Sequence, residues 1–238
     1  MITTDGIVLS TIRYSDSSVI AKIYAEQSGL GSFMVRTGSG KKALTKLALL
    51  QPLSLVELTY KDDHRKGIHS PRSLERSISL STIPFDTIKT CIALFLAEII
   101  ARSIHEEEQN KRLFQFLKQA ILMLDTSTEN CSNFHLKFML EFSAYLGFYP
   151  HVFKEEAYFD LYEGEFVNSV PIHAHYTQGL VTTKLAELIA LPLAQYHLLQ
   201  VGGGIRRALL QKLIDYFRLH LDGMKELRSH KVLEEVLS

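Results

Sequence analysis

Five short segments in which apolar and polar residues alternate occupy the first 83 residues of the chain. In the second segment, for example, Val19, Ala21 and Ile23 alternate with Lys22 and Tyr24. This period of two is typical of strands that bury one face. Clusters of Ser, Asp and Gly, which favour turns, separate the segments. The pattern predicts five antiparallel strands joined by turns.

One short helical run, Lys42 to Leu50, lies between the third and fourth of these segments. Five antiparallel strands with a helix at that point are the plan of an OB-fold, a small barrel whose strands and loops often bind oligonucleotides. The pattern is equally typical of any other small five-stranded barrel.

Pro84 opens a second region, in which apolar residues recur at helical spacing. Gly147 is placed to stop one of its helices, and a later helix is expected from Gly204 to Leu221. The segment from Tyr158 to Val167 has the pattern of a β-hairpin.

We therefore expect an α+β chain of two domains. The first, residues 1–83, is a five-stranded OB-fold barrel that binds DNA. The second, residues 84–238, is an all-α helical domain with a small β-hairpin insertion near residues 156–168.

Charge is segregated along the chain although the total is zero. Residues 1–83 hold 11 Lys and Arg against 7 Asp and Glu, residues 84–200 hold 8 against 14, and residues 201–238 hold 7 against 5. Charge separated by region says more about partners than the total does. A basic β region followed by an acidic helical region suits a protein that binds nucleic acid with one part and protein with the other.

The sequence gives no sign of secretion or of a membrane span. The N-terminus lacks the basic and apolar regions of a signal peptide. The longest apolar-rich stretch, Cys91 to Ala101, is too short for a span and carries Glu98. Cys91 and Cys131 have no disulfide-type spacing, which favours reduced cysteines in a cytoplasmic protein.

Motif fragments that suggest catalysis lack essential residues. Lys42, at the end of Gly38-Ser-Gly-Lys-Lys42, stands where a phosphate-binding loop needs Ser or Thr for magnesium. His173 and His175 have no set of further ligands near them in sequence, so loop histidines in solvent are favoured over metal ligands. The sequence therefore predicts no catalytic residue, no metal, no cofactor and no small-molecule substrate.

Basic residues of the first region, and a few near the C-terminus, are the candidates for phosphate contacts, which need no base sequence. They are Arg13, Lys22, Arg36, Lys41, Lys42, Lys46, Arg65, Lys66, Arg72, Arg76, Arg206, Arg207 and Arg228. Four interleaved aromatic residues, Tyr14, Tyr24, Phe33 and Tyr60, are candidates for stacking on bases. The alternative, with equal weight, is that the aromatics are core and the charges a solvated rim.

Several strings in one fixed order resemble the RecO family of bacterial recombination mediators. They are Gly6 to Ser18, Val35 to Gly38 with Lys41-Lys42, Leu50 to Leu58, Lys137 to Phe142 with Leu146 to Pro150, and Lys225 to Ser229. The resemblance implies an OB-fold followed by a helical domain, without enzymatic turnover. It also implies a nucleoid-associated bacterial protein of the cytoplasm that binds single- and double-stranded DNA and anneals complementary strands.

The partners that the resemblance implies are the protein RecR and the single-stranded-DNA-binding protein SSB, which are engaged to help load the recombinase RecA. In the family the acidic C-terminal tail of SSB meets a basic residue near the central helix together with an apolar cleft. The match falls on Lys137 beside Phe138, with Arg112 and Lys118 on the preceding helix as the next candidates.

The chain departs from the family pattern at one place. Many members have a four-cysteine zinc site after the central helix, but residues 155–175 contain no cysteine here. Because zinc has no thiolate to bind there, we expect aromatic packing to replace the metal.

Two classes of function remain open at this point. The first is a DNA-annealing and recombinase-loading factor without an active site. The second is a protein-binding adaptor whose OB-fold contacts a protein partner in place of DNA.

Overall fold

The computed structural model describes residues 1–38, 40–62, 67–105, 108–151, 157–222, 224 and 227–237, with the backbone alone at Lys42. The chain divides into two compact units, Met1–Thr126 and Ser127–Ser238. The predicted domain boundary at Ile83–Pro84 lies inside the first unit and stays a prediction.

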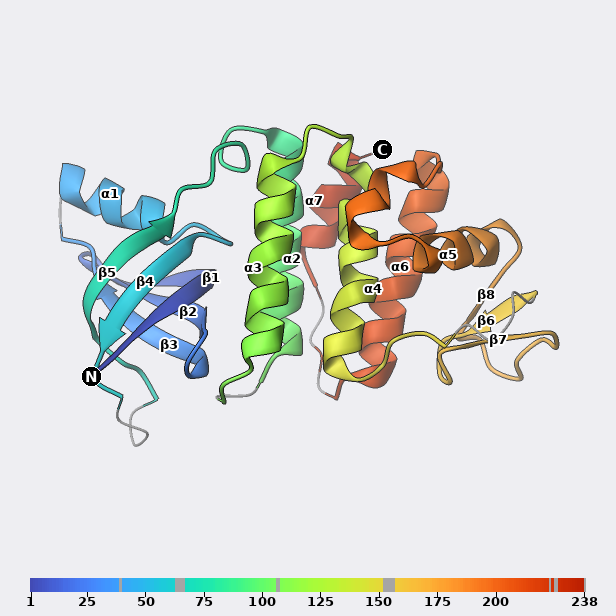
Figure 1. Ribbon diagram of the computed structural model, residues 1–238, viewed down its shortest axis with the longest axis horizontal. Coiled ribbons are helices and arrows are strands. Elements are labelled where there is room, and N and C mark those ends of the chain that lie inside the picture. The colour runs from blue at the N-terminus through green and yellow to red at the C-terminus, as the bar shows by residue number, and fades with distance from the viewer. Residues whose placement is uncertain are drawn as a thin grey trace. The chain divides into compact units, whose positions relative to one another are not determined.

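A five-stranded antiparallel sheet forms the centre of the first unit (Figure 1). Its strands lie in the order β3-β2-β1-β4-β5. Their bounds are β1 (Ile2–Ser15), β2 (Ser18–Ala25), β3 (Gly29–Arg36), β4 (Leu55–Tyr60) and β5 (Pro71–Ile78). The five predicted strands are confirmed, as is the short helix α1 (Lys41–Leu49) between the third and the fourth.

The two edges of this sheet meet at one point. The Met34 amide donates to the His69 carbonyl at 2.8 Å and the His69 amide donates to the Ser32 carbonyl at 2.9 Å, which forms a parallel bridge between Phe33 and His69. The strand order and this contact fit the expected OB-fold. Among the described residues no ladder joins β3 to β5, so the sheet is not a fully closed barrel.

The predicted alternation separates the core from the outside of the sheet. Val19, Ala21 and Ile23 of β2 belong to one buried cluster with Phe33 and Val56 from neighbouring strands. Side chains of a strand point to opposite faces in turn, so Ile20 and Lys22 lie on the other face. Hydrophobic burial on one face therefore sets the register of the whole sheet.

Two helices, α2 (Thr87–Ser103) and α3 (Lys111–Thr126), run side by side in the first unit (Figure 1). The Asp86 side chain caps α2 by accepting from the Lys89 amide at 3.0 Å. The Tyr24 ring of β2 lies 6.2 Å from the Phe114 ring of α3. These contacts place the helices against part of the outer face of the sheet.

The second unit is mainly helical (Figure 1). Its elements are η1 (Cys131–Asn133), α4 (Phe134–Leu146), β6 (Tyr158–Asp160), β7 (Glu165–Val167), β8 (Tyr176–Gln178), α5 (Leu180–Ala190), η2 (Leu193–Leu198), α6 (Gly203–His220) and α7 (Ser229–Val236). As predicted, Gly147 ends α4, with a left-handed φ of 89° that suits glycine. Among the described helices, none has both the length and the apolar character to cross a membrane.

The predicted hairpin is confirmed as β6 and β7, with Gly164 at a φ of 70° in the turn. The structure adds β8, which pairs with β6 to give a three-stranded sheet in the order β7-β6-β8. The sequence did not indicate β8, because no short turn joins this three-residue strand to the hairpin as Gly164 joins β6 to β7.

Candidate nucleic-acid interface

Three of the predicted DNA-binding cations line one pocket in the first unit. Arg36 ends β3, Lys46 lies in the last turn of α1, and Arg72 lies near the start of β5. The pocket has a volume of about 410 Å³ and contains Met34 and Leu74 as its apolar wall. It lies at the point where β3 approaches the segment that leads into β5.

The turn between β3 and α1 brings these residues together. Gly38 and Gly40 both have positive φ values, 73° and 66°, which residues with a side chain rarely adopt. The Lys46 ammonium then reaches back and donates to the Arg36 carbonyl at 2.7 Å. The hydrogen bond holds α1 beside the end of β3.

Within the part of the chain that the structure describes, Arg36, Lys46 and Arg72 have no carboxylate partner. No carboxylate among these described residues therefore neutralises their three positive charges. A pocket lined by such charges attracts an anion such as a phosphate group.

The other predicted cations of the first unit are arranged differently. Arg13 forms an exposed ion pair with Asp16 at 3.0 Å. The Lys22 ammonium donates to the Ala101 carbonyl of α2 at 3.3 Å, and burial together with nearby Arg102 lowers its pKa. Lys41 is exposed at the first turn of α1. The Lys42 side chain, Arg65 and Lys66 lie outside the described residues.

Three further predicted cations, Arg206, Arg207 and Arg228, lie in the second unit. All three guanidinium nitrogens of Arg206 donate internally: Nε to the Asn133 side chain at 3.0 Å, Nη1 to the Leu237 carbonyl at 2.9 Å and Nη2 to the Val201 carbonyl at 3.1 Å. Burial lowers its pKa. Arg206 thus joins three segments of the second unit.

Arg207 and Arg228 are more exposed to solvent than Arg206. Arg207 is about half exposed, with Nε 4.0 Å from a carboxylate oxygen of Glu234. Arg228 is exposed at the start of α7.

The structure also decides between the two roles left open for the aromatic residues. Tyr24, Phe33 and Tyr60 have at most 1% of their surface exposed and are core residues. Stacking on bases was therefore the wrong interpretation for these three. Tyr14 differs, because 62% of its surface is exposed near the end of β1.

The residues predicted to bind an acidic tail are distributed over both units. Lys137 of α4 is fully buried: its ammonium lies 2.7 Å from the Glu141 carboxylate and donates to the Ile189 carbonyl at 3.2 Å. Phe138 beside it is also buried. In the first unit, Lys118 pairs with Asp5 at 2.7 Å, and Arg112 is exposed.

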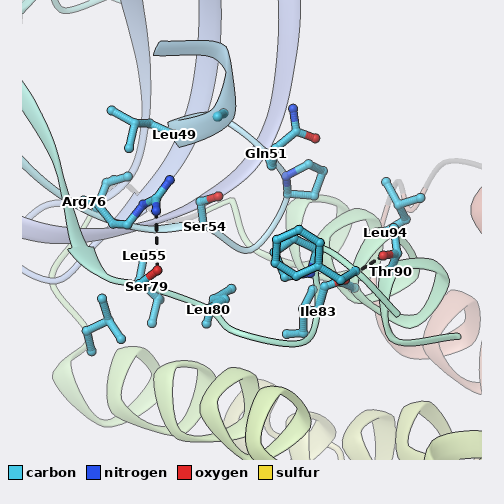
Figure 2. Close-up of a pocket in the computed structure, with 17 residues that line it drawn as sticks. Leu49, Gln51, Ser54, Leu55, Arg76, Ser79, Leu80, Ile83, Thr90 and Leu94 are labelled. Carbon is cyan, nitrogen blue, oxygen red and sulfur yellow. Dashed lines mark hydrogen bonds between the residues drawn. The ribbon is translucent and has the colours of Figure 1, made fainter. Parts of the chain in front are cut away.

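Figure 2 shows a second pocket of the first unit, which the sequence did not indicate. Its volume is about 450 Å³, and most of its wall is apolar, including Leu55, Ile83 and Leu94. Arg76 of β5 stands at one side, where Nη1 donates to the Ser79 hydroxyl at 3.4 Å. The wall comes from segments between Ala48 and Leu94, so only the fold reveals it.

No group of three or more potential metal ligands occurs among the described residues. Aromatic rings gather in the three-stranded sheet instead. The rings of Phe159 and Phe166 lie 4.9 Å apart, and those of Tyr158 and Tyr176 lie 5.7 Å apart. His173, one of the two loop histidines, contacts Asp160 at 3.2 Å. The absence of zinc stays a prediction.

The first unit thus combines an OB-type sheet with a cationic pocket, which is an arrangement typical of nucleic-acid-binding domains. Comparison with known proteins is more specific. Residues 1–76 match the family model "Recombination protein O N terminal" and residues 84–160 match "Recombination protein O C terminal".

Full-length relatives agree with these matches. A protein of Bacteroides fragilis named "DNA repair protein RecO" is 38% identical over 98% of each chain. The protein of the same name in Flavobacterium psychrophilum is 36% identical, and the match covers 100% of this chain and 99% of that protein. That of Porphyromonas gingivalis is 27% identical over 98% of each. The chain belongs to the RecO family of DNA repair proteins, as the sequence strings predicted.

Proposed function

We propose that this chain is a non-enzymatic recombination mediator of the bacterial nucleoid. It binds single- and double-stranded DNA, anneals complementary strands and helps load a recombinase onto SSB-coated DNA. The convergence of Arg36, Lys46 and Arg72 on one pocket is the observation that carries the proposal.

The physical basis is the neutralisation of phosphate charge. Lysine and arginine bind phosphates without regard to base sequence and release condensed counterions as they do so. Two complementary strands repel each other through their phosphates, so a protein that holds several phosphates on cations lowers the cost of bringing the strands together.

Charge removal at the pocket tests this proposal. We expect the triple variant Arg36→Gln, Lys46→Gln and Arg72→Gln to bind every DNA sequence more weakly. The slope of log affinity against log salt should become shallower by about 0.7 to 0.9 for each phosphate that the protein no longer binds. Fluorescence anisotropy at several salt concentrations measures both effects.

A matched control removes the same charge elsewhere. The variant Lys61→Gln, Lys111→Gln and Lys212→Gln loses three cations outside the pocket. It should keep the salt slope of the unmodified protein. If the slope of log affinity against log salt is the same for the two triple variants, the pocket does not bind DNA phosphates.

RecR and the acidic tail of SSB are the partners that we propose from the family resemblance. The pocket in Figure 2 has the chemistry that the tail needs, because it places the Arg76 guanidinium beside an apolar wall. Lys137 is less suited, because its ammonium is buried against Glu141.

The apolar pocket also supports the alternative function, a protein-binding adaptor whose OB-fold does not contact DNA. The two functions differ in an annealing assay without any partner protein. A mediator accelerates pairing of complementary strands in that assay, whereas an adaptor does not.

A further inference from the structure

A row of apolar side chains crosses three strands of the first unit. Ile12 of β1 is paired with Ile20 of β2, and Ile20 is paired with Met34 of β3. Residues that are directly opposite in an antiparallel pair lie on the same face with Cβ atoms about 4.5–5.5 Å apart. The three side chains therefore form one continuous line, called the apolar row below.

The apolar row lies on the outer face of the sheet. Ile20 stands between Val19 and Ala21, which both belong to the buried core. Because successive side chains of a strand point to opposite faces, Ile20 and its partners point away from that core. Ile12 has 68% of its surface exposed.

Helices of the same unit cover only a part of this outer face. One row further along, Lys22 donates to the Ala101 carbonyl of α2. A row beyond that, the Tyr24 ring contacts Phe114 of α3. The apolar row lies one row further from Tyr24 than Lys22 does, and 68% of the surface of Ile12 is exposed.

The apolar row also adjoins the cationic pocket. Met34, at one end of the row, is itself a wall of the pocket that Arg36, Lys46 and Arg72 line. Near the other end, Tyr14 follows Ile12 by two residues, at an irregularity of β1 between Arg13 and Ser15, and exposes 62% of its surface. The apolar row is thus continuous with a group of cations, and an exposed aromatic ring lies close to its other end.

We infer that the apolar row and Tyr14 form a stacking platform for the unpaired bases of a single strand. The phosphates of that strand lie on the cations of the pocket. The inference rests on the proposed DNA binding and goes beyond it, because it names the residues that distinguish single strands from duplexes. In a duplex the base faces are stacked on one another, so they are not free to lie on the platform, and the phosphates remain for the cations to bind.

The chemistry of the platform favours nucleic acid as its occupant. Bases present a broad apolar face next to a negative phosphate, and that combination matches an apolar surface that borders three cations. Stacking also leaves the hydrogen-bonding edges of the bases free. A strand held in this way can pair with a complementary strand while it is bound, which is what annealing requires.

Substitution of Tyr14 tests the inference, with a short thymidine oligonucleotide and a duplex of the same length as probes. Tyr14→Ala should weaken single-strand binding about tenfold, change duplex binding less than about twofold and leave the salt slope as it was. Tyr14→Phe should restore single-strand affinity, because the ring is kept. Tyr145→Ala, which removes an exposed tyrosine of the second unit, should affect neither probe.

A fluorescent reporter gives an independent measurement, because the chain contains no tryptophan. The indole of Tyr14→Trp should be quenched by the oligonucleotide and not by the duplex, whereas Tyr145→Trp should respond to neither. Equal losses for single strand and duplex in Tyr14→Ala, or an unquenched indole in a protein that binds the oligonucleotide, would overturn the platform. A protein that binds neither probe would refute the proposed function itself. A change of oligomeric state in Tyr14→Ala without a change of DNA affinity would assign the surface to a second copy of the chain.

Discussion

Single residues decide stability where charge is buried, and Asp125 at the end of α3 is the clearest example. Its carboxylate accepts from the backbone amides of Ser81 at 2.7 Å, Thr82 at 2.8 Å and Ile83 at 2.9 Å. Burial alone raises the pKa of Asp125, but these hydrogen bonds outweigh it and hold the pKa below its usual value. The carboxylate thereby fixes the segment that leaves the sheet.

We expect Asp125→Ala to lower the free energy of unfolding by about 2–4 kcal/mol, because three backbone amides, that of buried Ile83 among them, lose a charged acceptor. The pKa is lower in the folded state, so the unfolded state binds more protons. The stabilisation is therefore complete above the unfolded pKa of about 4 and is lost as the pH falls through the folded pKa. Urea melts at neutral and acidic pH measure this. The exposed Asp222→Ala should stay within about 0.5 kcal/mol, and a similarly small effect at Asp125 would contradict the role given to it.

Lys137 shows how a buried charge alters a functional prediction. From the sequence it is an isolated cation among apolar residues, yet Glu141, four positions later on the same helix face, is its ion-pair partner. We expect Lys137→Met to change the melting temperature but to keep the affinity for an SSB tail peptide within about twofold. Arg76→Glu should lower that affinity about tenfold through charge repulsion. If Lys137→Met lowers the affinity for the peptide and Arg76→Glu does not, with both variants folded, the SSB tail binds at α4.

At the scale of elements, the sequence predicted what local chemistry controls. Alternation indicated the strands of the large sheet, and Gly147 indicated the end of α4. Contacts between segments that are distant in the chain could not be predicted from the sequence. The pocket of Arg36, Lys46 and Arg72 depends on two glycines with positive φ and on the bridge at His69, and no local pattern encodes that convergence.

The three-stranded sheet is an element whose stability we predict to need no metal. Phe159 is buried and contacts the rings of Phe166 at 4.9 Å and Tyr216 at 5.9 Å, so apolar packing is available to hold β6 in place. Elemental analysis should find no stoichiometric zinc, and a chelator should not lower the melting temperature. Phe159→Ala should cost about 3–5 kcal/mol. One tightly held zinc per chain would refute this account.

At the scale of the whole molecule, the two family matches and the two compact units divide the chain differently. The matches separate between residues 76 and 84, whereas the first unit extends to Thr126. Contacts inside that unit explain its extent. Lys118 of α3 pairs with Asp5 of β1 at 2.7 Å, and Asp125 binds the segment that follows the sheet. The helices α2 and α3 therefore complete the sheet physically, although the family description begins a new part with them.

Truncation distinguishes the two divisions. A fragment of residues 1–126 keeps α2 and α3, and we expect it to unfold in one cooperative thermal transition. A fragment of residues 1–83 exposes Ile7, Leu9 and Tyr24, which are at most 2% exposed in the full chain. Ile7 and Tyr24 are paired on the outer face, and Phe114 of α3 contacts Tyr24 there, so the shorter fragment loses the burial that α2 and α3 provide. It should melt at a lower temperature or aggregate, as circular dichroism and light scattering will show. If residues 1–83 melt as cooperatively and at the same temperature as residues 1–126, the boundary at Ile83–Pro84 is also the boundary of an independent folding unit.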